Sequence, residues 1–367
     1  MWLGDALRRL LSTERHDRPA AIAPDAVRDL DGLRALLDGG GPAARERLEL
    51  AGRRFAGARF GDAIAAADTS GLRVLDLSEN RLGAGGVRAL AASPSLGGLE
   101  VLVLRGDQLG DAGARLLAAS PSLRRLRVLV LSGNAIGDDG AAALAESPLA
   151  ASLDTLVLSG NRIGARGAQA LASSPALEKL RALDVGRNPL GDAGAQALAD
   201  GRLAALRTLG LARADLTARA LWALAASPLT ATLDALVLKG NRLDAAGVAA
   251  LAGAPRRSTL RALDLCRNRV GDDGARALAA SAALAGLEVL NLTRAGIGDA
   301  GAEALASAGA LPSLRVLELC GNRIGEPGRR AFERARPFER LRLDGNHVTS
   351  ARPRAEPPDP LPAAQVG

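Results

Sequence analysis

Residues 72–82 read LRVLDLSENRL, and this pattern, LxxLxLxxNxL, decides how most of the chain folds. Its central leucine, Leu75, has equivalents every 27 residues as far as Leu317, apart from one step of 26 residues between Leu183 and Leu209. Self-similarity at a fixed period of this length indicates a repeat architecture. Degenerate copies extend the register to residues 48–55 and 338–348, so we predict about 12 units of 27 residues.

Each unit is predicted to form a strand, a turn, a helix and a loop. The alternating leucines around Leu75 are typical of a short strand with one face in a core. The asparagine at the end of the pattern, as at Asn80, can pair main-chain groups of a buried turn and link stacked units. The following stretch, such as residues 110–118 (GDAGARLLA), predicts a helix. A glycine recurs in this helix at the position of Gly113, and we expect it to permit close approach of the helix to the strand.

On these residues the chain resembles a leucine-rich repeat protein of the ribonuclease-inhibitor type, and it is similar to the repeat regions of Ran GTPase-activating protein and of NOD-like receptors. The resemblance covers residues 45–348 and implies an α/β horseshoe solenoid, with parallel strands on the concave face and helices on the convex face. It also implies a function carried by binding another macromolecule. Ribonuclease inhibitors are rich in Cys and use aromatic, acidic concave surfaces, whereas this chain has two Cys, no Tyr and a net charge of +7. The composition therefore argues against ribonuclease inhibition.

The segments that flank the repeats have other compositions. Residues 1–44 show two stretches with helical spacing of apolar residues, and we predict a helical cap over the first repeat, because solenoids need capped ends. A small docking module is the alternative for this segment. It has no uninterrupted apolar run that would predict a signal peptide or a membrane span. The Pro-rich residues 349–367 predict a disordered tail.

Catalysis is not expected, and we predict no catalytic residue, no cofactor and no metal ion. The two histidines, His16 and His347, lie outside the most regular part of the chain, so a Ser-His or Cys-His mechanism would lack its base. Neither Lys179 nor Lys239 follows a glycine, which excludes a P-loop.

The two cysteines are predicted to be free thiols. Cys266 and Cys320 occupy equivalent positions two repeats apart, which is about 9.6 Å and beyond the reach of about 7 Å that a disulfide needs. With no His nearby, a metal site is not expected there. Unpaired Cys without a signal sequence indicates a reducing compartment, and we predict a cytoplasmic location.

The concave face is predicted from the residues between the strand leucines. In its first half, valines would form an exposed apolar patch flanked by Asp76 and Asp184, and such patches mark binding sites. The alternative is that these valines only reflect the strand preference of β-branched residues. The second half is more polar, with Asp264, Asn291 and Glu318.

Arginines follow the strands and are predicted to form a basic rim beside the concave face. They are Arg81, Arg162, Arg187, Arg213, Arg242, Arg267, Arg269, Arg294 and Arg323. This rim fits an acidic protein partner. Nucleic acid is not expected, because carboxylates are interspersed and stacking aromatic residues are absent.

One unit, residues 206–232, is irregular. The 26-residue step falls here, Ala214 replaces the turn Asn, and Trp222 occupies a helix position that other units fill with solvent-facing residues. Trp is enriched in binding hot spots, so Trp222 is a candidate partner contact on the convex side. Local repacking that buries the ring is the alternative.

The residue after the first leucine of each unit alternates in charge. The series runs Arg73, Glu100, Arg127, Asp154, Arg181, then Arg207, Asp234, Arg261, Glu288, Arg315. Opposite charges on neighbouring strands support a stack weakly, so we interpret this series as structural.

We therefore predict a monomeric, non-enzymatic scaffold that binds a protein partner through the concave face and the rim. The residues assigned to partner binding are Asp76, Val101, Val103, Arg105, Val128, Val130, Val157, Asp184, Arg187, Arg213, Trp222, Arg267 and Arg294. The resemblance to Ran GTPase-activating protein gives the alternative, a regulator that activates a small GTPase. A purely structural repeat protein is the third hypothesis.

Overall fold

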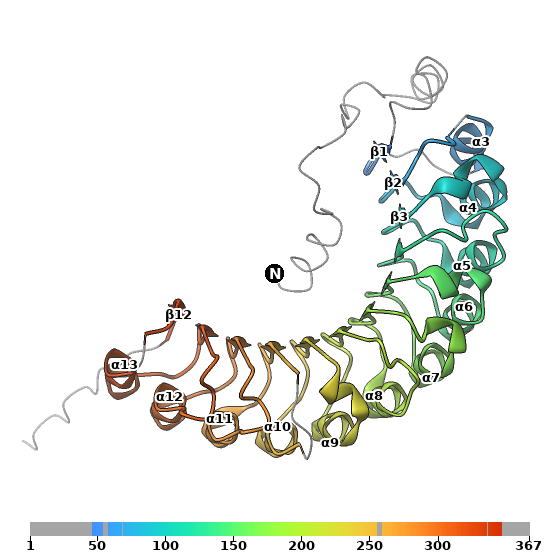
Figure 1. The fold of residues 1–367 in the computed structure, drawn as a ribbon. Helices are drawn as coiled ribbons and strands as arrows, with labels where there is room; N and C mark the ends of the chain where they lie inside the picture. The colour runs from blue at the N-terminus through green and yellow to red at the C-terminus, as the bar shows by residue number, and fades with distance from the viewer. Residues whose placement is uncertain (1–45, 54–57, 68, 255–258, 336, 347–367) are drawn as a thin grey trace, which may run out of the picture.

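The computed structural model describes residues 46–53, 58–67, 69–254, 259–335 and 337–346, which form an open, curved solenoid (Figure 1). The strands are β1 (Arg47–Glu49), β2 (Val74–Asp76), β3 (Val101–Val103), β4 (Val128–Val130), β5 (Thr155–Val157), β6 (Ala182–Asp184), β7 (Thr208–Gly210), β8 (Ala235–Val237), β9 (Ala262–Asp264), β10 (Val289–Asn291), β11 (Val316–Glu318) and β12 (Arg340–Arg342). The α-helices are α3 (Ala58–Ala66), α4 (Gly83–Ala92), α5 (Gly110–Ala118), α6 (Asp138–Ala145), α7 (Ala165–Ser173), α8 (Gly191–Ala199), α9 (Ala218–Ala226), α10 (Ala245–Ala252), α11 (Gly271–Ala279), α12 (Asp299–Ala306) and α13 (Glu326–Glu333). Short 3₁₀ helices lie between helix and strand at η3 (Pro94–Gly98), η4 (Pro148–Ser152), η5 (Pro175–Leu177) and η6 (Pro228–Ala231). The predicted cap, residues 1–44, and the predicted tail, residues 349–367, lie outside the described residues.

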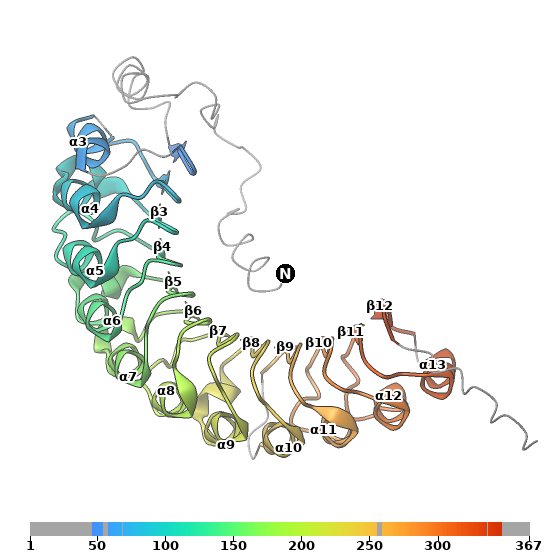
Figure 2. The same cartoon turned by 180° about the vertical axis from the view of Figure 1, so that it is seen from behind.

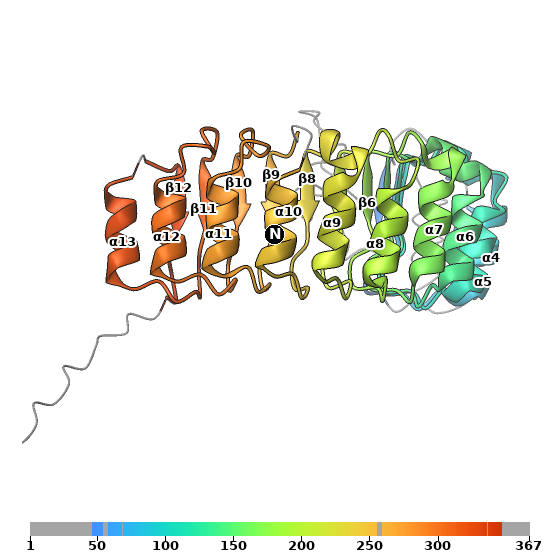
Figure 3. The ribbon, with the colours of Figure 1, turned by 90° about the horizontal axis from the view of Figure 1, so that it is seen from below.

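All twelve described strands pair in chain order in one parallel sheet. Leu75 pairs with Leu102, and Leu183 pairs with Leu209 in spite of the shorter step between them. The sheet lines the concave face and the helices cover the convex face, as Figures 1 and 2 show. Figure 3 shows the helices side by side along the outside. The stack curves because a helix with its side chains is about 10 Å wide, whereas adjacent strands are only about 4.8 Å apart. The predicted horseshoe solenoid is confirmed.

A thin layer of leucine and alanine between the sheet and the helices is the core. Leu75 and Leu77 from one repeat are fully buried, and Leu90 of the following helix is 1% exposed. The same positions are buried in the repeats that follow, so the core is continuous along the solenoid. Each repeat needs only short aliphatic side chains, which explains how a chain with 2% aromatic residues builds it.

The recurrent asparagine links consecutive repeats, as predicted. Asn134 Oδ1 accepts the main-chain N–H groups of Asp107 at 2.9 Å and Leu109 at 3.3 Å. Its Nδ2 donates to the carbonyl oxygen of Leu104 at 2.5 Å. Asn161 and Asn241 repeat this arrangement. Asp107, Ala214 and Ala295 take the asparagine position in three repeats, and all three are fully buried.

The recurrent helix glycine permits a close approach, but not the predicted one between helix and strand. A Cβ on Gly140 would lie 2.5 Å from Asp111 Oδ1, an atom of the preceding helix, and 2.7 Å from Cγ2 of Ile136. Asp111 Oδ1 accepts the N–H groups of Gly137 at 2.6 Å and Gly140 at 3.1 Å, so it caps α6. The expected helix-to-strand contact is therefore wrong: Gly140, Gly167, Gly301 and Gly328 make room for a carboxylate from the neighbouring helix. The same cap is made for α7, α12 and α13 by Asp138, Asp272 and Asp299. Gly113, Gly194 and Gly274 instead lie against the apolar side chain four residues earlier.

Candidate protein-binding surface

The predicted valine patch forms its own cluster, separate from the leucine core, but it is not an exposed surface. The cluster contains Val103, Val128, Val130 and Val157, with Val101 packed against it. Val130 is 2% exposed and Val157 is 3% exposed, so the expectation of an exposed patch is wrong. Strands about 4.8 Å apart let β-branched side chains of consecutive repeats cover one another. The valines therefore pack against one another and are largely buried.

The acidic residues at the strand ends are engaged in local turns. Asp184 Oδ1 accepts the N–H of Gly186 at 3.0 Å, and burial raises the pKa of this carboxyl. Asp76, Asp264 and Asn291 make the same bond to the residue two positions on. This is the Asx turn, in which a short polar side chain pairs its own backbone. Asp76 and Asp184 thus hold strand ends in place, a role that the sequence did not reveal.

Four of the assigned arginines hold their backbone in the left-handed region. The φ angles are 54° at Arg187, 52° at Arg213, 56° at Arg267 and 53° at Arg294. Glycines with φ between 67° and 71° occupy the same turn elsewhere, namely Gly52, Gly106, Gly133, Gly160, Gly240, Gly321 and Gly345. A residue with a Cβ pays about 1 kcal/mol or more in this conformation. Glu79 takes the same turn with φ of 63°, so a side chain is retained in this conformation at five repeats, and four of the five carry an arginine. Such strain makes these four arginines candidates for a functional site.

The four left-handed arginines are exposed, and their guanidinium groups have no ion pair or hydrogen bond within the described part of the chain. The arginines at the other end of the strands are different. Arg127 pairs with Asp154 of the next repeat at 2.6 Å, and Arg73 pairs with Glu100 at 3.7 Å. The same pairing joins Arg261 to Glu288 and Arg315 to Glu339. The predicted charge ladder is confirmed for three of its pairs, Arg73–Glu100, Arg127–Asp154 and Arg261–Glu288, and Arg315–Glu339 extends it by one repeat.

Contacts with the next repeat hold two of these arginines in place. A Cβ on Gly240 would lie 3.0 Å from Cγ of Arg213, and a Cβ on Gly321 would lie 2.9 Å from Cγ of Arg294. The arginine stems therefore lie directly over these glycines. The main-chain N–H of Arg213 donates to the carbonyl oxygen of Lys239 at 2.8 Å. In Arg213 and Arg294 the backbone and the start of the side chain are thus held against the next repeat.

Two further cations lie one residue before this turn. Arg105 is exposed after β3, and its N–H donates to Ser78 Oγ at 3.3 Å. It stands apart from the four left-handed arginines in sequence and along the sheet. Lys239, after β8, lies between the repeats of Arg213 and Arg267. The sequence-based list missed Lys239, although aligning the repeats column by column would have found it.

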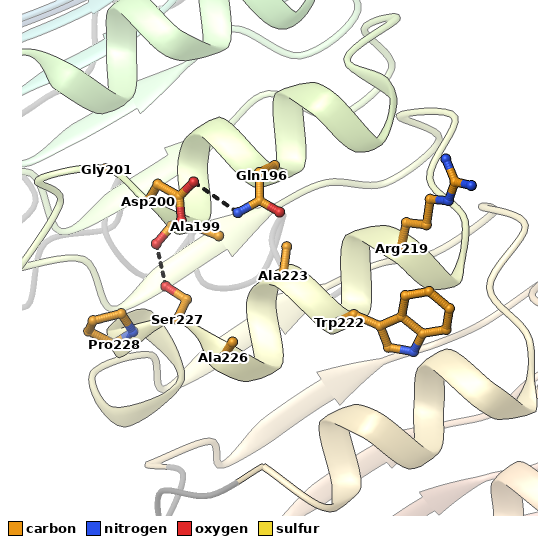
Figure 4. A pocket seen from close by; sticks show the side chains of 10 residues that line it. All are labelled: Gln196, Ala199, Asp200, Gly201, Arg219, Trp222, Ala223, Ala226, Ser227 and Pro228. Atoms are coloured by element: carbon orange, nitrogen blue, oxygen red, sulfur yellow. Dashed lines mark hydrogen bonds between the residues drawn. The ribbon is translucent and has the colours of Figure 1, made fainter.

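Trp222 lies on the convex side, on α9, and is 51% exposed, so the alternative of a buried, repacked ring is wrong. Among the side chains whose exposure the structure describes, it is the one exposed large hydrophobic side chain. Figure 4 shows it beside Arg219, at the edge of a hollow of about 660 Å³ between α8 and α9. Asp200 in this hollow accepts a hydrogen bond from Gln196 at 2.8 Å. Trp222 is therefore not part of the concave surface.

Both cysteines are free thiols, as predicted. Burial raises the pKa of the Cys266 and Cys320 thiols, so neither is an activated nucleophile. Among the described residues, no group of three or more His, Cys, Asp and Glu could hold a metal ion. No helix in the same residues has both the length and the apolar character to cross a membrane.

Comparisons with known proteins agree with the architecture. The family model described as "Leucine Rich repeat" matches residues 72–91, 122–145, 150–172, 176–199, 258–279 and 287–306. No curated protein matches the chain. Among solved structures, the chain is similar to one from the complex of Rad7 and Elc1 in yeast, with 17% identity, a TM-score of 0.50, and coverage of 87% of this chain and 80% of that chain.

An internalin (inlF) from Listeria monocytogenes is similar with 16% identity, a TM-score of 0.48, and coverage of 84% of this chain and 94% of that chain. At these identities the likeness concerns the fold alone. The finer resemblance to the ribonuclease-inhibitor type, to Ran GTPase-activating protein and to NOD-like receptors stays a prediction.

Proposed function

We propose that this chain of leucine-rich repeats is a non-enzymatic scaffold that binds an acidic protein partner through the arginine rim of its concave face. One observation carries the proposal: Arg187, Arg213, Arg267 and Arg294 keep a strained backbone although no described residue pairs with their guanidinium groups. A strained, exposed and unpaired cation destabilises the free protein slightly. The presence of arginine at these positions is explained if a partner protein supplies the anion that pairs with each guanidinium group.

The concave face supports this assignment through rigidity. The Asx turns at Asp184 and Asp264 fix the strand ends that precede Arg187 and Arg267. A preorganised surface loses little side-chain and loop entropy when it binds, so affinity benefits.

The charge of the chain favours the same kind of partner. With a net charge of +7, the chain attracts acidic proteins over distances of about 8–10 Å at ordinary ionic strength. We therefore expect association that slows as salt is added, as for other electrostatically steered complexes. The two free thiols favour a reducing compartment, so the partner is to be sought among cytoplasmic proteins.

Photo-crosslinking from defined positions tests the proposal. Benzoylphenylalanine replaces Arg242 or Arg269 on the rim, or Gln169 or Glu303 on the convex helices; all four side chains are exposed. We expect one discrete crosslinked protein of acidic composition from the rim positions and none from the convex positions. Crosslinks from the convex positions alone would overturn the proposal and favour the side that carries Trp222.

The identity and behaviour of the captured protein distinguish the scaffold from the alternative, a GTPase regulator. If the crosslinked protein is a small GTPase and the chain accelerates its GTP hydrolysis, the regulator is correct. If turnover is unchanged, or the captured protein binds no nucleotide, the scaffold is correct.

A further inference from the structure

The four left-handed arginines that follow a strand end in this turn fall into two pairs along the solenoid; Arg81, with φ of 56°, is left-handed at a position two residues further on in its repeat. Arg187 and Arg213 follow the adjacent strands β6 and β7, and Arg267 and Arg294 follow the adjacent strands β9 and β10. Gly240 takes the same turn after β8, between the two pairs, and the residue before it is Lys239. We call the five cations Arg187, Arg213, Lys239, Arg267 and Arg294 the arginine track.

We propose that the arginine track binds an extended acidic peptide segment whose two key carboxylates are four residues apart, each held between the arginines of one pair. This inference rests on the proposed function and names the chemistry of the partner. A guanidinium group matches a carboxylate through two parallel hydrogen bonds, and two adjacent guanidinium groups can enclose one carboxylate.

The spacing of the pairs sets the spacing of the carboxylates. The step from Arg187 to Arg267, like that from Arg213 to Arg294, crosses three strand spacings of about 4.8 Å, or about 14 Å. An extended peptide advances about 3.4 Å per residue, so residues i and i+4 lie about 14 Å apart and on the same side. Two acidic residues at i and i+4 therefore reach both pairs at once.

The surface beside the arginines leaves room for a peptide main chain. Each arginine of the pairs is preceded by a small residue: Gly186, Ala212, Cys266 and Thr293. Gly210, at the end of β7, has no side chain in the middle of the track. The peptide main chain can thus approach the surface closely between the two pairs.

Recognition by this surface uses side chains and not added backbone pairing. The main-chain N–H groups of Arg187, Arg213, Arg267 and Arg294 already donate to carbonyl oxygens of the next repeat at 2.6–2.8 Å. Only the guanidinium groups remain to bind an anion. This makes the carboxylate positions, and not the peptide backbone, the basis of specificity.

A single-stranded nucleic acid fits the same surface less well. None of the twelve described strands contains an aromatic residue on which a base could stack. A phosphodiester chain also carries a charge on every unit, so some phosphates would face Asp184, Asp264 or Glu318 on the strands. A peptide avoids this, because its residues between the two carboxylates can be neutral.

Fluorescence anisotropy with labelled 13-residue peptides tests the proposal. The probe is a Ser/Thr peptide with Glu at positions 5 and 9; the comparison peptides have Gln at both positions, or Glu at positions 5 and 7. A twelve-nucleotide oligothymidylate is the nucleic-acid arm. We expect the 5,9 peptide to bind at least about tenfold more tightly than either comparison peptide, as a pair of charge-assisted bonds implies, and to weaken with added salt.

The variant that removes the track is Arg213→Gly with Arg267→Gly. Glycine relieves the left-handed strain, so a loss of binding does not reflect unfolding, and circular dichroism checks this. The matched control is Arg127→Ala with Arg261→Ala, which removes the same charge from the opposite, N-terminal ends of the strands β4 and β9. We expect at least about tenfold weaker binding in the track variant and less than about twofold change in the control.

Three outcomes would overturn the inference. The first is no binding of the 5,9 peptide, and the second is an equal loss of peptide affinity in the track variant and in the control variant. The third is that oligothymidylate binds more tightly than the 5,9 peptide and loses affinity in the track variant. The last result would assign the track to nucleic acid. If the peptides fail while rim crosslinks to an acidic protein persist, the proposed function stands and the i, i+4 assignment is wrong.

Discussion

Asp107 Oδ1 accepts the main-chain N–H of Asn80 at 2.8 Å, the bond that an asparagine makes at this position in other repeats. The side chain is fully buried, yet its Oδ2 has no hydrogen-bond partner. In Asn134 the corresponding atom, Nδ2, is a donor to the carbonyl oxygen of Leu104. Only protonated Asp107 can donate in this way, so in its ionised form Oδ2 is a buried, charged oxygen without a hydrogen-bond donor.

We expect Asp107 to make stability depend on pH. Burial raises its pKa from 3.8 to about 6, and the nearby Asp76 carboxylate contributes. Because the folded state binds this proton more tightly, stability falls as pH rises from about 4 to about 6, by roughly 3 kcal/mol in all. Asp107→Asn should abolish this loss and be more stable than the wild type at pH 7.5. Melting temperatures of Asp107→Asn and of the wild type, measured from pH 4 to pH 8, should differ by an amount that increases up to about pH 6–7. A difference between the two proteins that stays constant over this range contradicts the assignment.

The cap that Asp138 makes for the helix of the next repeat predicts a clear contrast with its neighbour. Asp138 Oδ1 accepts the N–H groups of Gly164 and Gly167, whereas Asp139 makes an exposed ion pair with Arg166. Asp138→Ala should lower the free energy of unfolding by about 1 kcal/mol and Asp139→Ala by less than about 0.5 kcal/mol. Urea denaturation measures both. Equal losses would show that the inter-repeat cap adds nothing.

Gly140→Ala should destabilise the protein, against the usual benefit of alanine in a helix. A new Cβ would lie 2.5 Å from Asp111 Oδ1, so the capping carboxylate has to move. We expect a loss of about 1–3 kcal/mol, as for other overpacked sites. Gly97→Ala is the control, because nothing lies within 4 Å of its Cβ position. Thermal unfolding of both variants measures the loss. Unchanged stability of Gly140→Ala would contradict the close approach of residue 140 to Asp111.

The left-handed backbone of Arg267 predicts an inverted preference between glycine and alanine. At Arg267, with φ of 56°, Arg267→Gly should be more stable than Arg267→Ala by about 1 kcal/mol. At Arg261, which is not among the positive-φ residues, alanine should be the more stable by about 0.5–1 kcal/mol. Four melting curves test this sign reversal. The same order at both positions would mean that the turn is not strained.

The exposure of Trp222 predicts a small effect on stability. With a side chain that is 51% exposed, Trp222→Ala should cost less than about 1 kcal/mol, far below the loss for a buried aromatic residue. In a Trp2→Phe background, emission from Trp222 alone should be that of a solvent-exposed indole. A blue-shifted spectrum together with a loss of several kcal/mol would show that the ring is buried.

The period of the leucines predicted the solenoid, its strand register and the number of repeats, because each of these depends on spacing alone. Asn134 and its equivalents also disclosed their role, since a buried amide in a turn must pair main-chain groups. Bonds that individual side chains make to the next repeat were harder to predict from the sequence. The cap from Asp111 to Gly140 joins residues 29 positions apart, and nothing in the local sequence marks such a bond.

The candidate surface was predicted only in part, and the reasons are physical. The exposure of Val130 depends on how closely neighbouring strands bring side chains together, which a list of residues does not contain. The arginines of the rim were visible as a column. Their strain was not recognised, because it follows from the glycines that take the same turn elsewhere, such as Gly106 and Gly133.

The inter-repeat caps also give the solenoid a direction of assembly. Asp111 serves α6 and Asp138 serves α7, so each of these carboxylates belongs to the repeat that leaves the ribosome before the helix it starts. A newly synthesised helix therefore meets a finished template on its N-terminal side. Truncation after a complete repeat removes none of these caps from what remains, whereas deletion from the other end leaves a helix without one.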